Sequence, residues 1–266
     1  MQTGLIFGLT AIAALVPAIA LTWRQHFSRN LAFWAVMALA CVGPASAVIA
    51  RSTDAWQADF STSIWVTISA TMALFLVFSA IERSVWRLAP LLSTYMLALS
   101  LIGFAWQHAY EEPVYLGDNP GLLVLHIGFA LTTYGLATLA AVAALAAFLQ
   151  ERALKRKQKP ILDGVLPSVT DCDRLVIRFL GIGETVLGLG LMTGIFLNII
   201  GGEAVLRADH KTIFTVAAFV IIGILLIAHA RQGLRGRRAS RIVLLAYLLL
   251  TLGYPGVKFV TDVLIS

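Results

Sequence analysis

Residues 121–149 read GLLVLHIGFALTTYGLATLAAVAALAAFL and contain no Asp, Glu, Lys or Arg. A helix of about 20 apolar residues crosses the hydrocarbon core of a bilayer, so this stretch is long enough to span a membrane and to extend beyond it. Its start is marked by Asn119, which can cap a helix, and by Pro120, which suits the first helical position. The stretch predicts one long transmembrane helix that reaches into the cytoplasm.

The same apolar pattern recurs on both sides of this stretch, at residues 3–23, 31–50, 62–81, 88–107, 177–200, 212–230 and 240–262. Over the whole chain 59% of residues are hydrophobic and 13% are charged, whereas roughly 25% are charged in an average soluble protein. The mean hydropathy is +0.86. A water-soluble fold could not bury this much apolar surface. We therefore predict an all-α polytopic membrane helix bundle of about eight transmembrane helices, with residues 1–266 forming a single integral membrane domain.

The basic residues predict the orientation of the chain. Sixteen of the 20 lysines and arginines fall in alternate turns, at Arg24, Arg29, Arg83, Arg87, Arg152, Lys155, Arg156, Lys157, Lys159, Arg174, Arg178, Arg231, Arg235, Arg237, Arg238 and Arg241. The remaining connections and the C-terminal end hold Arg51, Arg207, Lys211 and Lys258. Cytoplasmic loops carry the excess of positive charge, so we expect a bacterial inner (cytoplasmic) membrane protein with both termini outside. Because the charge of +6 is spread over short turns, it indicates membrane orientation and no nucleic-acid partner.

The connection from residue 150 to residue 178 is the one long segment on the basic side. Ser168 followed by Asp171 resembles a capping box, and the apolar side that follows consists of Leu175, Val176, Phe179 and Leu180. This pattern predicts a short interfacial helix that merges into the sixth span, and the alternative is a disordered basic linker. Within the sixth span, Gly190 and Gly194 form a small-residue pair suited to close helix contact.

Motifs of common enzymes are absent from the sequence. It has no P-loop, zinc motif, G-x-S-x-G or paired carboxylates, so we do not expect an enzyme. Its two cysteines, Cys41 and Cys172, predict no disulfide framework, and the covalent haem motif C-x-x-C-H is missing. The tryptophans fit an aromatic belt, since most lie near the ends of apolar runs, at Trp23, Trp34, Trp56, Trp65, Trp86 and Trp106.

Three polar residues lie inside apolar runs. His126 is flanked by apolar residues on both sides, and burying it requires a hydrogen bond or a metal. His229 is similarly embedded, just before a cluster of arginines whose planar guanidinium groups are suited to haem propionates. Glu184 is the one acidic residue well inside a span; it could serve a proton path, pair with an arginine, or be a protonated bystander. A histidine at a membrane boundary is otherwise often an amphipathic headgroup residue.

Four segments resemble the cytochrome c assembly family, which includes CcsA-, CcmC- and HemX-like proteins, and in particular its YpjD-like branch. They are GLLVLHIGFALTTYGLATLA around His126, LGLMTGIFLNI in the sixth span, HARQGLRGRR from His229 onward, and the ending LGYPGVKFVTDVLIS. The resemblance makes residues 121–266 a cytochrome c assembly-like core. Over the first 120 residues it extends mainly to the pattern of spans.

The resemblance implies a non-catalytic membrane protein that binds haem b through histidines and works with other proteins of cytochrome c assembly. His126 matches the first external ligand and His229 matches the ligand within the membrane. The resemblance leaves His210 or His108 as further external candidates and His26 as a partner of His229. Candidate propionate partners are Arg231 and Arg235 inside, and Arg207 and Lys211 outside. His126 and His229 should lie more than about 20 Å apart, near opposite faces of the bilayer.

The loop after the sixth span supports an alternative reading. It reads GGEAVLRADHKT and lacks the tryptophans of the family's external motif, and no second external histidine follows it. The chain could instead be a non-catalytic scaffold for another membrane complex. A further alternative is a small-solute transporter that uses Glu184 as its coupling carboxylate.

Overall fold

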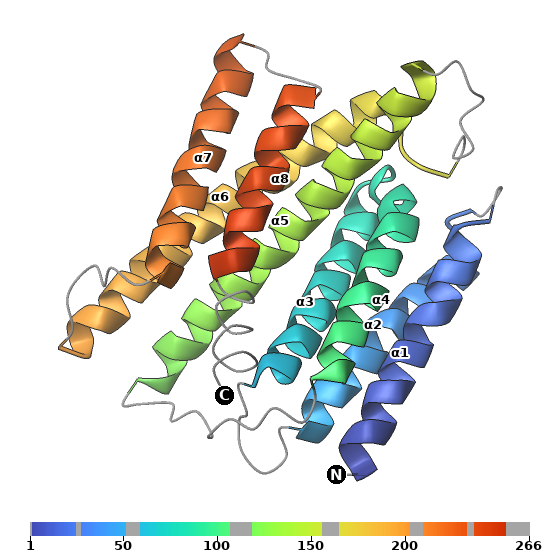
Figure 1. The fold of residues 1–266 in the computed structure, drawn as a ribbon, viewed down its shortest axis with the longest axis horizontal. Coiled ribbons are helices and arrows are strands. Elements are labelled where there is room, and N and C mark those ends of the chain that lie inside the picture. The colour runs from blue at the N-terminus through green and yellow to red at the C-terminus, as the bar shows by residue number, and fades with distance from the viewer. Residues whose placement is uncertain are drawn as a thin grey trace.

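The computed structural model describes residues 2–24, 28–51, 59–106, 119–155, 165–202, 210–232 and 237–253 (Figure 1). In these parts the chain forms eight α-helices and one 3₁₀ turn, with no strand, so the prediction of an all-α bundle is confirmed. The elements are α1 (Gln2–Thr22), α2 (Leu31–Arg51), α3 (Phe60–Ile81), η1 (Val85–Leu88), α4 (Ala89–Ala105), α5 (Pro120–Lys155), α6 (Val169–Ile200), α7 (His210–Gln232) and α8 (Arg237–Thr251).

Seven of the described helices are long and apolar enough to cross a membrane. The apolar part of α8, Ala239–Thr251, is shorter than a full span. The remainder of the expected eighth span, residues 254–262, lies outside the described residues. The start of α5 at Pro120 agrees with the prediction from its sequence.

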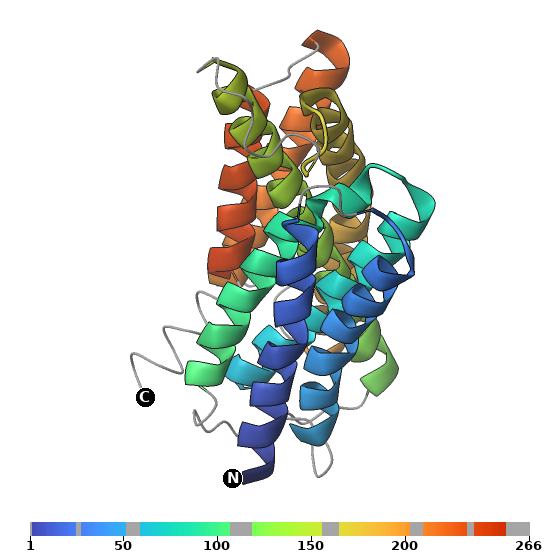
Figure 2. The same cartoon turned by 90° about the vertical axis from the view of Figure 1, so that its right-hand side faces the viewer.

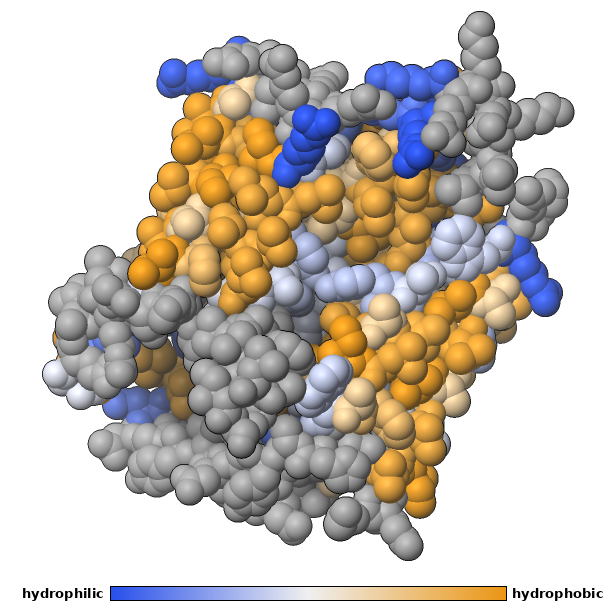
Figure 3. All heavy atoms as spheres, viewed as in Figure 1, coloured by the Kyte–Doolittle hydropathy of each residue, from blue (hydrophilic) through white to orange (hydrophobic). Residues whose placement is uncertain are grey.

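The helices form two groups that meet along α3 and α5 (Figures 1 and 2). One group contains α1 to α4, and the other contains α5 to α8, where the contact between α5 and α6 is the most extensive. Successive helices alternate in direction. The turns that carry the predicted cytoplasmic charges therefore lie at one end, the upper end in Figure 1, and Figure 3 shows hydrophilic side chains along that edge.

Reporter fusions would test the orientation predicted from the charges. A periplasm-active reporter fused after Ser266 should be active, whereas the same reporter fused after Lys159 should be inactive, because the basic turns are retained in the cytoplasm. A cytoplasm-active reporter at the same two positions should give the opposite pattern. If both reporters showed the reverse pattern, every inside and outside assignment would be wrong.

α5 and α6 are the two longest helices, with 36 and 32 residues. At about 1.5 Å per residue each exceeds the hydrocarbon core of about 30 Å, and Figure 1 shows that both run obliquely across the bundle. Glycines of α6 face α5 along this contact. A Cβ on Gly183 would lie 3.5 Å from Leu136 Cβ, and one on Gly190 would lie 3.5 Å from Phe129 Cβ.

The start of α6 confirms that Ser168 caps the helix and pairs with Asp171, as the sequence predicts. Ser168 Oγ accepts a hydrogen bond from the Asp171 backbone N–H at 3.1 Å and donates one to Asp171 Oδ2 at 2.7 Å. The expected interfacial helix is the first part of α6 itself, which continues without interruption into the span. Its predicted apolar side is buried, at Leu175, Val176, Phe179 and Leu180.

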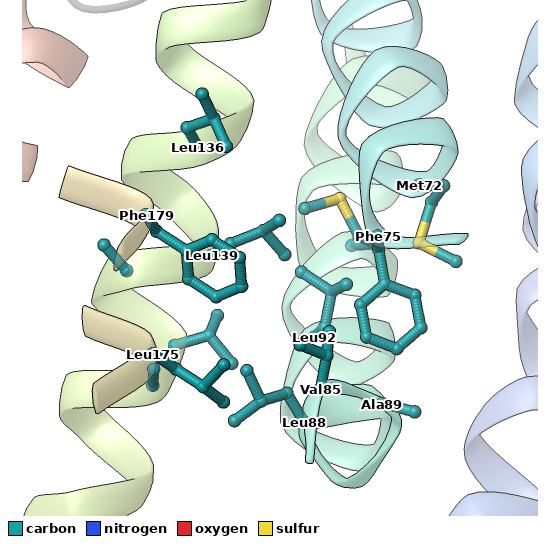
Figure 4. Packing of buried hydrophobic residues seen from close by; sticks show 14 of the residues in the cluster. Met72, Phe75, Val85, Leu88, Ala89, Leu92, Leu136, Leu139, Leu175 and Phe179 are labelled. Atoms are coloured by element: carbon teal, nitrogen blue, oxygen red, sulfur yellow. The ribbon is translucent and has the colours of Figure 1, made fainter. Parts of the chain in front are cut away.

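The core joins the two groups of helices (Figure 4). Leu139 of α5 and Phe179 of α6 lie opposite Leu88 and Leu92, which come from η1 and α4, and all four side chains are buried. Phe179 also packs edge-on against the Phe78 ring at a centroid distance of 5.2 Å. These contacts fix how the second group lies against the first.

A cluster of side-chain hydroxyls also joins the two groups of helices. Tyr247 of α8 lies with its hydroxyl 2.6 Å from the Tyr95 hydroxyl of α4 and donates to the Tyr134 hydroxyl of α5 at 3.2 Å. Thr138 Oγ1 lies 3.2 Å from Tyr247 Oη, and Thr251 Oγ1 lies 3.4 Å from Tyr134 Oη. In Figure 3 a pale band of weakly hydrophilic residues separates two hydrophobic areas on this face. Polar groups satisfy one another where α8 meets its neighbours.

Candidate functional site

His126 lies near the start of α5, with its half-buried side chain against α6. Its Nδ1 atom is 3.1 Å from the carbonyl oxygen of Gly190 and 3.1 Å from Thr193 Oγ1. The ring also lies over Gly194, where a Cβ would come within 3.1 Å of His126 Cε1. The predicted small-residue pair therefore does more than bring two helices close together, because it forms the surface on which the imidazole rests.

The hydrogen bonds around Nδ1 define the protonation of the ring. Thr193 Oγ1 donates to the Gly190 carbonyl at 2.9 Å, so its proton is already used. Both neighbours of Nδ1 therefore accept, and in the neutral imidazole Nδ1 carries the proton while Nε2 keeps its lone pair. No hydrogen bond to Nε2 occurs within the described part of the chain. A histidine that donates one ring N–H to a carbonyl and keeps the other nitrogen available has the arrangement of a metal ligand.

His229 lies in the last turn of α7, and its side chain is half-buried. Arg231, two residues later, is exposed. His126 is six residues from the start of α5 and His229 is nineteen residues from the start of α7, so helix rise separates their depths by on the order of 20 Å. A metal–nitrogen bond is about 2 Å long, and the two rings cannot ligate one iron.

Several expected site residues lie outside the described residues: His26, His108, Arg207 and Arg235. The side chains of His210 and Lys211, at the start of α7, also lie outside them. Thr193 and the Gly190 carbonyl are contacts of His126 that the sequence did not predict. No group of three His, Cys, Asp or Glu side chains gathers in the segments that the structure describes.

Glu184 belongs to a different interface. Its side chain points from α6 toward α7, with Oε1 3.2 Å from the place where a Cβ on Gly223 would lie. Oε2 is buried and makes no hydrogen bond to any described residue. Arg178, on the same helix, forms an ion pair with Glu82 at the end of α3. Glu184 thus contacts α7, whereas the His126 ring contacts α6 from α5.

If the chain binds haem through His126, Glu184→Gln should leave that binding unchanged. The substitution keeps the size of the side chain but removes its ability to ionise, and it lies away from the His126 contacts. Haem content per protein, measured by absorbance, should match the parent within error. A large loss of haem in a folded variant would place Glu184 in the same site as His126.

Similarity to known proteins extends over nearly the whole chain. The family model described as cytochrome C assembly protein matches residues 23–265. The chain is 48% identical to the uncharacterized 28.8 kDa protein in the nifR3-like 5' region of Azospirillum brasilense, over the full length of both. It is 28% identical to the inner membrane protein YpjD of Escherichia coli K12, over 96% of this chain and 94% of that protein. No solved structure matches significantly. The family match extends from the end of α1 nearly to the last residue, and the chain therefore belongs to the cytochrome c assembly protein family.

Proposed function

We propose that this chain is a multi-pass protein of the bacterial inner membrane that binds haem b and handles it for cytochrome c assembly without catalysing a reaction. The observation that carries the proposal is the state of His126, whose Nδ1 is held by Gly190 and Thr193 while Nε2 keeps its lone pair. Imidazole nitrogen is a common axial ligand of haem iron. Membership of the family and the likeness to an inner membrane protein support the same reading.

The donor set fits a haem group. His126 is half-buried against α6, and its Nε2 keeps a lone pair for iron, as an axial ligand requires. Bound haem supplies the iron and the two propionates. The chain supplies His126 for iron at an outer site, with Arg207 and Lys211 as candidate propionate partners. His229 supplies the ligand of a separate inner site, beside Arg231 and Arg235.

Absorbance spectroscopy of the purified protein tests this proposal. Protein from haem-sufficient cells should show a Soret band, and the pyridine haemochrome should be that of haem b. Protein prepared from haem-depleted cells should gain the same band when haemin is added. Absence of the band from both preparations would overturn the proposal and favour a scaffold that belongs to the family but binds no haem.

A second candidate function rests on Glu184. A buried carboxyl oxygen with no hydrogen bond to a described residue is costly within a membrane, and such groups often carry protons. A small-solute transporter coupled through Glu184 would take up protons when solute is added to proteoliposomes, and Glu184→Gln would abolish that uptake. We favour haem handling because family membership and the His126 contacts support it independently.

A further inference from the structure

A cleft of about 410 Å³ opens where the start of α2 meets the turn between α3 and η1, and it is lined by Arg29, Trp34, Arg83 and Trp86. Its volume falls within the range of about 300–1,000 Å³ occupied by sites for small ligands. It lies at the end of the bundle that carries the basic turns. Neither His126 nor His229 lines it, and a ligand bound here would be independent of the proposed function.

The walls of the cleft are held by packing. Phe33, which is fully buried, packs edge-on against both tryptophans, with centroid distances of 5.3 Å to Trp34 and 5.9 Å to Trp86. On its other side, Phe33 lies 6.5 Å from the Phe75 ring in the core. The two indole rings are therefore fixed relative to the bundle, so the cleft is preformed.

The charge of the cleft is positive. Arg29 lies with its guanidinium carbon 5.1 Å from the centre of the Trp34 ring and donates to the Ala80 carbonyl at 3.3 Å. Arg87 lies over Trp86 at 5.6 Å, and Arg83 is exposed at the mouth. Glu82, the acidic residue of this turn, forms an ion pair with Arg178 and accepts a hydrogen bond from Ser84. Among the described residues no carboxylate pairs with Arg29, Arg83 or Arg87, so these arginines can bind an anion from outside the chain.

We propose that this cleft binds the phosphate group of an anionic phospholipid. Guanidinium groups bind phosphate through paired hydrogen bonds, and tryptophan settles at the depth of lipid headgroups. Apolar surface for the acyl chains adjoins the cleft, since Leu31 and Ile81, each two residues from a cleft arginine, are 84% and 64% exposed. This surface favours a lipid over soluble phosphate as the source of the anion.

Native mass spectrometry of the detergent-purified protein tests the site with phosphatidylglycerol as the probe. The parent should retain phosphatidylglycerol in preference to phosphatidylcholine. Arg83→Gln, which removes an exposed side chain without disturbing packing, should weaken retention about fivefold, as expected from roughly 1 kcal/mol per basic residue near an anionic lipid surface. Arg29→Gln together with Arg83→Gln should weaken it about 25-fold.

Arg152→Gln is the matched control, because Arg152 is an exposed arginine of α5 at the same end of the bundle and outside the cleft. It should retain phosphatidylglycerol like the parent. Equal retention by the parent, Arg83→Gln and the double variant would overturn the proposal, as would equal weakening by Arg152→Gln. Displacement of the lipid by equimolar inorganic phosphate would show a soluble-phosphate site and would also overturn it. Should the double variant not fold, Arg83→Gln alone decides the outcome. Haem content should be the same in all these variants.

Discussion

Replacing both His126 and His229 by alanine should abolish haem binding, whereas either single replacement should remove about half of the haem. The two histidines are separated in depth by on the order of 20 Å, so under the proposed function each would bind its own iron. Loss of an axial ligand leaves the iron of that site without its protein bond while the other site keeps its ligand. Haem per protein, measured by pyridine haemochrome on each purified variant, gives the result directly.

Two controls make this result specific. Glu184→Gln alters a polar side chain within the same bundle and should retain the haem content of the parent. Thermal unfolding of the apoproteins should show that the alanine variants are folded. A folded double variant that copurifies with as much haem as the parent would refute the assignment of both ligands.

Gly194→Leu should reduce haem content at the outer site as strongly as His126→Ala does. A Cβ at residue 194 would lie 3.1 Å from His126 Cε1 and 3.6 Å from Nδ1, and the rest of a leucine side chain needs further space. The imidazole must move away and lose its contacts with Gly190 and Thr193. Forcing extra atoms into packed space also costs about 1–3 kcal/mol of stability.

Gly181→Leu is the matched control on the same helix. A Cβ on Gly181 meets nothing within 4 Å, so this change alters helix propensity equally but leaves His126 in place. Comparing haem content and melting temperature of the two variants isolates the effect on the ring. Equal haem content in both would mean that the position of His126 does not matter for binding.

The sequence predicted most helices because apolar runs of membrane length are an unambiguous signal. The start of α6 was harder to predict from hydropathy, because Asp171, Asp173 and Arg174 lower the hydropathy of its first turns. The helix nevertheless begins at Val169, where the capping box marks it. Here a local hydrogen-bond pattern located the helix start better than hydropathy did.

The contacts of the sites were harder to predict than the residues. His126 stood out by its apolar neighbours, but its pairing with Gly190 and Thr193 depends on how α5 and α6 align, which no local pattern encodes. The surroundings of the tryptophans were likewise not predictable from their positions in the sequence. Trp65 is 1% exposed and belongs to the core, and Trp34 and Trp86 form a cleft that their positions near span ends did not reveal.

The hydroxyl cluster around Tyr247 has a consequence for how the chain enters the membrane during synthesis. In the described part of α8, Tyr247 lies among apolar residues. Its hydroxyl is a polar group that lipid cannot satisfy.

A ribosome makes α4 and α5 before α8, so Tyr95 and Tyr134 are already in the bilayer when Tyr247 leaves the exit tunnel. Their hydroxyls offer Tyr247 the hydrogen bonds that surrounding acyl chains withhold. Because α8 is made after α4 and α5, it meets its hydrogen-bond partners as soon as it reaches the bilayer.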